Sequence, residues 1–82
     1  MSKLHIDILL ALRASGVFGV AAEDLLTDMR RGRHRDLTLP DLERALRDLA
    51  DKNFAAPFTS ALCNKRWAIA AIGERALQQE GL

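Results

Sequence analysis

The chain has 82 residues, of which 12 are Lys or Arg and 11 are Asp or Glu, giving a net charge of +1. A chain of this length forms a single domain over residues 1–82, and its core is small because short chains bury only about 60–65% of their unfolded surface. The single cysteine excludes an internal disulfide and, with only two histidines, a zinc site of four Cys and His ligands. The sequence lacks a signal-peptide layout and an apolar run of the ~20 residues that a membrane span needs, so we expect a cytoplasmic protein with no membrane partner.

The first predicted element is a helix over residues 3–14. Apolar residues recur every four positions from Leu4 to Leu12, which places them on one helical face, and Ser2 is a suitable N-cap. The glycine-rich segment 16–20 is too short for a helix, so it predicts a turn that carries one or two buried apolar side chains.

A second helix is predicted over residues 22–30. Glu23 and Asp24 fall in its first turn, where carboxylates suit the positive end of the helix dipole. The segment 30–37 then breaks the helical periodicity and predicts a loop, with Gly32 in position to end the helix.

The third helix is the clearest element, and it is predicted to begin after Thr38 and to run to Lys52. Thr38 and Asp41 form a variant of the capping box, and Pro40 lies in the first turn, where its missing N–H costs nothing. A narrow apolar stripe follows the helix: Leu39, Leu42, Ala45, Leu46 and Leu49. Asn53 can adopt the left-handed conformation that ends a helix.

After this helix the pattern changes to two short predicted strands, over residues 54–59 and 66–70. Pro57 donates no hydrogen bond to a neighbouring strand, which confines the first strand to an edge of the sheet or to a position facing solvent. Residues 71–80 predict a last helix, although Gly73 near its start lowers the helix propensity.

This order of elements resembles a winged helix-turn-helix. Residues 46–55 resemble the end of the recognition helix in that family, with Asn53 in place of the usual glycine. Residues 69–77 resemble the L-T-x-x-G-x-x-x-L motif common in MarR-type and PadR-type regulators, with Ala70 in place of the threonine. Residues 8–16 are similar to the family's first helix, and the small size and long loop also resemble the small winged-helix proteins of Mu-like bacteriophages.

The resemblance implies a mainly α fold with a small β-hairpin: a three-helix bundle, a two-stranded wing and a short C-terminal helix. It also implies a transcription regulator that binds double-stranded DNA, of phage or prophage origin. The sequence shows no phosphate-binding glycine loop, catalytic relay or metal-ligand spacing, so we expect neither an enzyme nor a bound cofactor or metal. Cys63, in the hairpin turn, is expected to be incidental rather than reactive.

The net charge conceals a basic cluster at residues 30–35, which contain four arginines in six positions. The segments on either side, 1–29 and 36–52, each carry two more acidic than basic residues. Guanidinium groups match the geometry of phosphate oxygens, and phosphate contacts set the register of a protein on DNA. The residues predicted to contact phosphate lie in this loop and in the hairpin: Arg31, Arg33, Arg35, Lys65 and Arg66.

In a winged helix the third helix normally enters the major groove. Thr38, Arg44 and Arg47 are therefore predicted to approach bases, and each arginine could contact a guanine edge through two hydrogen bonds. The alternative is a solvated helix in which Arg44 pairs with Asp48 and Arg47 pairs with Asp51.

Two further alternatives stay open at this point. The loop arginines could be solvated or could pair with Glu23, Asp24 or Asp28. The chain could also be a winged-helix protein–protein interaction module without DNA binding, which docks a partner through the third helix or the last helix. A homodimer through the last helix is compatible with either function.

Overall fold

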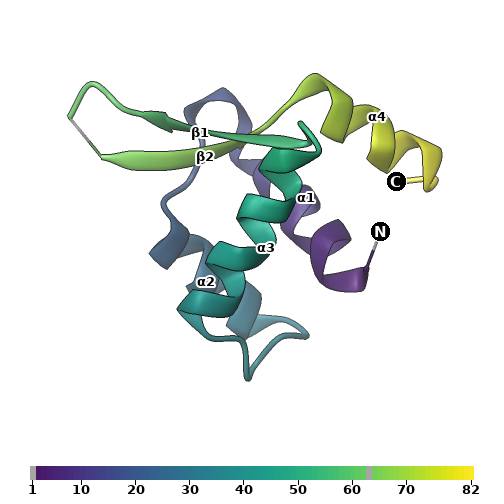
Figure 1. Cartoon of the computed structure of the whole chain (residues 1–82). Coiled ribbons are helices and arrows are strands. Elements are labelled where there is room, and N and C mark those ends of the chain that lie inside the picture. Colours follow the sequence, from purple (N-terminus) through teal and green to yellow (C-terminus); the bar gives the residue numbers. More distant parts are fainter. Residues whose placement is uncertain (1, 63) are drawn as a thin grey trace.

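A computed structural model of the chain describes residues 2–62 and 64–82 (Figure 1). The elements in chain order are α1 (Lys3–Ser15), a short 3₁₀ turn η1 (Gly16–Phe18), α2 (Ala22–Arg31), α3 (Leu39–Asp51), β1 (Ala55–Thr59), β2 (Lys65–Ile69) and α4 (Ala71–Gln79). Each predicted helix and strand is present, and its ends differ from the predicted ones by one residue at most.

The helix ends follow the capping signals of the sequence. At the start of α1 the Ser2 hydroxyl accepts a hydrogen bond from the His5 N–H at 3.2 Å. At the start of α3 the Thr38 hydroxyl accepts from the Asp41 N–H at 3.4 Å. Asn53, just past α3, has a φ of 63°, the left-handed conformation that Asn tolerates better than most residues. Local chemistry therefore fixes where α1 and α3 begin and where α3 ends.

The core lies between the helices and the inner face of the hairpin. Its largest fully buried side chains are Ile8, Leu9, Leu12, Leu25, Leu42, Leu46, Leu49 and Leu77. They come from all four helices, so the predicted apolar stripe of α3 is confirmed as its core face from Leu42 to Leu49, whereas Leu39 is only half-buried. No side chain caps the N-terminus of α4, where Ala70 replaces the expected hydroxyl residue, and burial of Leu77 anchors this helix instead.

The hairpin forms an antiparallel wing with a third backbone segment beside it. β1 pairs with β2 in a register that places Ala55 opposite Ile69. On the other side of β2, Val20 and Trp67 exchange two backbone hydrogen bonds of 2.9 and 2.8 Å. β2 is therefore the central strand, and β1, which contains Pro57, is an edge strand as predicted.

The segment 16–20 corrects part of one expectation: Val20 is partly buried and packs against the core, whereas Val17 and Phe18 are not buried anchors. Val17 is 85% exposed and Phe18 is 79% exposed. The backbone packs against the wing instead: Gly19 has a φ of +68°, and a Cβ there would lie 2.6 Å from the Trp67 carbonyl oxygen. This close approach requires glycine, and it places Val20 where it can pair with β2.

The residues that connect α2 to α3 form a loop with several fixed contacts. The Arg30 Nε donates a hydrogen bond of 2.8 Å to the Leu37 carbonyl, and the Leu37 side chain is buried. The His34 Nε2 lies 2.8 Å from Asp7 Oδ2 on α1. The loop is therefore fastened both to α2 and to the first helix.

Candidate nucleic-acid interface

The outer face of α3 carries the two arginines that the sequence assigned to base contacts. At ~100° per residue, the buried leucines of α3 leave Arg44 and Arg47 on the opposite, exposed side. The Arg44 side chain is 75% exposed, and its Nη1 lies 3.8 Å from Asp41 Oδ1. Exposed pairs of this kind contribute little free energy, so Arg44 is available to a ligand.

The expected pairs along α3 are not formed among residues 2–62 and 64–82. Arg44 contacts Asp41 rather than Asp48, and no ion pair joins Arg47 to Asp51. Asp48 instead lies 4.0 Å from the His5 ring on α1. The alternative in which Arg44 pairs with Asp48 and Arg47 pairs with Asp51 is therefore wrong. Asp48 lies near α1 instead.

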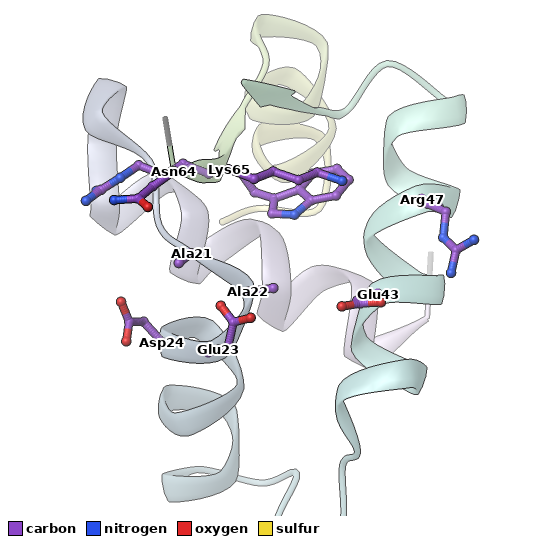
Figure 2. A pocket seen from close by; sticks show the side chains of 10 residues that line it. Ala21, Ala22, Glu23, Asp24, Glu43, Arg47, Asn64 and Lys65 are labelled. Atoms are coloured by element: carbon purple, nitrogen blue, oxygen red, sulfur yellow. The ribbon is translucent and has the colours of Figure 1, made fainter. Parts of the chain in front are cut away.

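A hollow of about 710 Å³ lies between the start of α2, the middle of α3 and the wing (Figure 2). Its charged lining residues are three carboxylates and three cations: Glu23, Asp24, Glu43, Arg47, Lys65 and Arg66. Figure 2 shows Glu23 and Glu43 pointing into the space between α2 and α3, whereas Arg47 projects outward from α3. The side of α3 that faces the wing is therefore of mixed charge.

The two cations of the wing have contacts of their own. The Lys65 Nζ lies 5.3 Å from the centre of the Trp67 ring, a cation–π geometry, and Trp67 is itself buried. The Arg66 guanidinium donates a hydrogen bond of 3.5 Å to the Phe18 carbonyl. Both residues lie at the start of β2, just after the hairpin turn. Cys63, in that turn, lies outside the described residues.

The second basic group is the segment 30–37, called the arginine loop below, although α2 extends to Arg31 and so includes Arg30 and Arg31 in its last turn. Arg31, Arg33 and Arg35 are exposed, and within the part of the chain that the structure describes none of them forms an ion pair. The expected alternative, pairing with Glu23, Asp24 or Asp28, is therefore not observed there. A hollow of about 500 Å³ at this loop is lined by residues of the loop and of α3: Arg33, His34, Arg35, Asp36, Leu37 and Asp41.

The two basic groups lie on different sides of α3: the arginine loop is at its N-terminal end, and Lys65 and Arg66, near the hairpin turn, line the hollow opposite the middle of α3. Figure 1 shows the arginine loop at the N-terminal end of α3 and the hairpin beside its C-terminal end. Thr38 lies between the loop and the helix, where its hydroxyl accepts the capping hydrogen bond from Asp41. Arg44 and Arg47 therefore lie on α3, Arg33 and Arg35 share a hollow with its first turn, and carboxylates line both hollows.

Sequence reasoning missed two features of this site. Glu43 lies between the core stripe and the outer face of α3, so rotating the helix at ~100° per residue would have found it. The contact between His34 and Asp7 joins residues 27 positions apart, and no local pattern signals it. In the described residues, no group of three or more His, Cys, Asp or Glu is placed to hold a metal ion. Nor is any helix there long and apolar enough to cross a membrane.

A scan against protein-family models and a search of curated proteins both find no match. Solved structures do match. The chain is similar to S. aureus MepR bound to ethidium bromide, with a TM-score of 0.79 and 18% identity over 95% of this chain and 53% of that one. It is also similar to the Helicobacter pylori ferric uptake regulator Fur, whose structure has three functional metal-binding sites, with a TM-score of 0.74 and 22% identity over 87% and 46%.

Both neighbours are winged-helix regulators, and the chain spans about half the length of each. The element order, four helices with a two-stranded antiparallel hairpin, is consistent with a winged helix. The fold is therefore a winged helix-turn-helix, as the sequence predicted.

Proposed function

We propose that the protein binds double-stranded DNA and acts as a transcription regulator. The observation that carries this proposal is the arginine loop: Arg31, Arg33 and Arg35 are exposed, beside α3, and without an ion pair among the described residues. Guanidinium groups in a fixed frame suit phosphate oxygens. The position of this loop next to a recognition helix favours the phosphates of a duplex.

The dimensions of α3 fit this role. Its 13 residues span about 20 Å. The major groove is about 12 Å wide, so a helix lying in it can place its two ends near the phosphates on either side. The arginine loop would contact one backbone at the start of α3, and Lys65 and Arg66 would contact phosphates through the wing. Thr38, Arg44 and Arg47 would approach the bases between them.

The structural neighbours support a regulator of this general kind. They are regulators rather than enzymes, which supports a role in binding rather than catalysis. The origin in a phage or prophage and a homodimer through α4 stay predictions. Two copies would read half-sites about one helical turn apart.

The test reverses two charges of the loop. In the variant Arg33→Glu with Arg35→Glu, binding to a duplex should be lost, because two phosphate contacts become repulsive. Arg33→Glu alone should already weaken binding strongly, and Arg75→Glu on α4 is its matched control, since it reverses one exposed charge outside the proposed interface and should have a much smaller effect. Mobility-shift titrations at low salt measure all three variants. Equal binding by the double variant and the wild type would remove the loop from the interface.

A second candidate function is a protein–protein interaction module. The carboxylates Glu23, Asp24 and Glu43 in the hollow beside the wing favour it, because they repel a phosphate backbone. This function predicts a protein complex that survives the charge reversal at Arg33 and Arg35. It also predicts no binding of the wild type to any duplex at low salt.

A further inference from the structure

We propose that Asp7 and His34 form a tether that holds the arginine loop in its phosphate-binding conformation, an inference that rests on the proposed DNA binding. The His34 Nε2 lies 2.8 Å from Asp7 Oδ2, and the two side chains are 21% and 22% exposed. A contact this short between largely covered groups is among the stronger hydrogen bonds of a small protein. It connects the loop to α1, which carries none of the predicted DNA contacts.

His34 is the centre of the loop in both sequence and hydrogen bonding. Its N–H donates to the Met29 carbonyl at 3.2 Å, and its own carbonyl accepts from the Leu37 N–H at 3.2 Å. Arg33 and Arg35 are its immediate neighbours in the chain. Fixing the His34 ring therefore fixes the backbone from which both of these arginines project.

The loop needs such a restraint because of its charge. Four arginine side chains in six positions repel one another, and of the four only the Arg30 side chain forms a hydrogen bond within the described residues, to the Leu37 carbonyl. Repulsion and side-chain entropy both favour an open, disordered loop. A loop already held in one conformation loses less entropy when it binds. The Asp7 carboxylate beneath the loop also offsets part of the repulsion.

The tether and simple electrostatics predict opposite effects when Asp7 is removed. Asp7→Ala raises the net charge of the protein by one, which should strengthen attraction to DNA if charge alone matters. If Asp7 positions the loop, the same change should weaken binding. The sign of the effect therefore separates a positioning residue from a surface carboxylate.

The experiment measures binding to a duplex of about two helical turns by fluorescence anisotropy at several salt concentrations. We expect Asp7→Ala and His34→Ala each to weaken binding about tenfold. They should also lower the salt slope, by about one for each phosphate contact that is lost. The double variant should bind no more weakly than the single ones, because either change breaks the same contact.

Two control variants make the result specific. Asp28→Ala removes an exposed carboxylate of α2 with the same change in net charge, and it should bind equally well or slightly better. His34→Gln keeps a side-chain N–H that can donate to Asp7, so it should retain most of the affinity. If Asp7→Ala does not fold, the comparison of His34→Gln with His34→Ala decides in its place.

Hydrogen exchange without DNA tests the tether independently of function. The amide of Leu37, which donates to the His34 carbonyl, should exchange faster in Asp7→Ala than in the wild type. Binding by Asp7→Ala as tight as that of the wild type would overturn the inference. If the wild type itself binds no duplex, the proposed function fails, and unchanged exchange at Leu37 would then also overturn the tether.

Discussion

At the scale of single residues, Gly73 shows how one absent side-chain atom sets the position of α4. A Cβ at this position would lie 2.1 Å from the Phe54 carbonyl oxygen. The same carbonyl accepts a hydrogen bond from the Ala70 N–H at 3.0 Å, so the backbone around it is fixed. The sequence marks Gly73 as a weakness of the helix, whereas the structure shows that glycine lets α4 pack closely against the backbone of Phe54, which connects α3 to β1.

Gly73→Ala should therefore destabilise the protein. Helix propensity alone predicts a gain of about 1 kcal/mol for this change. We expect a loss of about 1–3 kcal/mol instead, because the new methyl group forces the backbone apart. Urea denaturation measures the free energy of unfolding, and Gln78→Ala, on the exposed side of α4, should change it little. A more stable Gly73→Ala variant would show that α4 is not packed this closely.

His5 makes the stability depend on pH. Burial, with a further contribution from the charge of Lys52, lowers the pKa of His5 below its usual 6.5. The unfolded chain then binds the proton more tightly than the folded one, so stability falls as the pH falls below 6.5. His5→Gln removes this site, and the variant should gain stability relative to the wild type between about pH 7.5 and about pH 5. A stability difference that is constant over this range would contradict the assignment.

At the scale of elements, α3 buries one face in the core and exposes the opposite face, but the side of α3 that faces the wing carries both acidic and basic residues. Glu43 is half-buried in the same hollow as Arg47, Lys65 and Arg66, and among the described residues it has no ion-pair partner. A carboxylate here opposes a phosphate backbone approaching along the wing.

Glu43→Gln should therefore strengthen DNA binding. Removing one repulsive charge at a partly screened site changes affinity by about 2–5-fold, in line with about 0.5–1 kcal/mol for such a pair. Glu80→Gln, beyond the end of α4, carries the same charge change and should have less effect. Anisotropy titrations of the two variants side by side measure the difference. An unchanged affinity for Glu43→Gln would place the hollow outside the DNA interface.

The sequence predicted the elements well where their signals are local. The caps at Ser2 and Thr38 and the left-handed Asn53 depend on neighbours within a few positions. The bridge between Val20 and Trp67 could not be predicted, because it joins two segments far apart in the sequence.

The candidate site also combines features that a local sequence pattern signals with features that depend on contacts between distant residues. The arginine loop was visible as a run of four basic residues in six. The conformation of the loop could not be predicted, because it depends on the contact of His34 with Asp7. Which carboxylates pair with its arginines could not be predicted either, because that depends on which carboxylates the fold brings near. Asp48 illustrates the second point, since it lies beside His5 rather than Arg44.

At the scale of the whole molecule, the net charge of +1 is the sum of basic and acidic surfaces whose charges nearly cancel. The arginine loop lies at the N-terminal end of α3, Lys65 and Arg66 lie near the hairpin turn across a hollow from the middle of α3, and carboxylates line the hollows beside both groups. Under the proposed function, long-range attraction would contribute little to the affinity for DNA, and a few well-placed contacts would determine it. Those contacts would release counterions from the duplex, and this release is measurable.

The salt dependence of duplex binding tests this account most directly. If the three loop arginines and the two wing cations all contact phosphates, log K should fall with log salt at a slope of about −4 to −5. Affinity should then drop several-hundred-fold between about 50 and about 200 mM salt. Binding that is absent at low salt, or that does not change with salt, would contradict a phosphate-contacting arginine loop and wing.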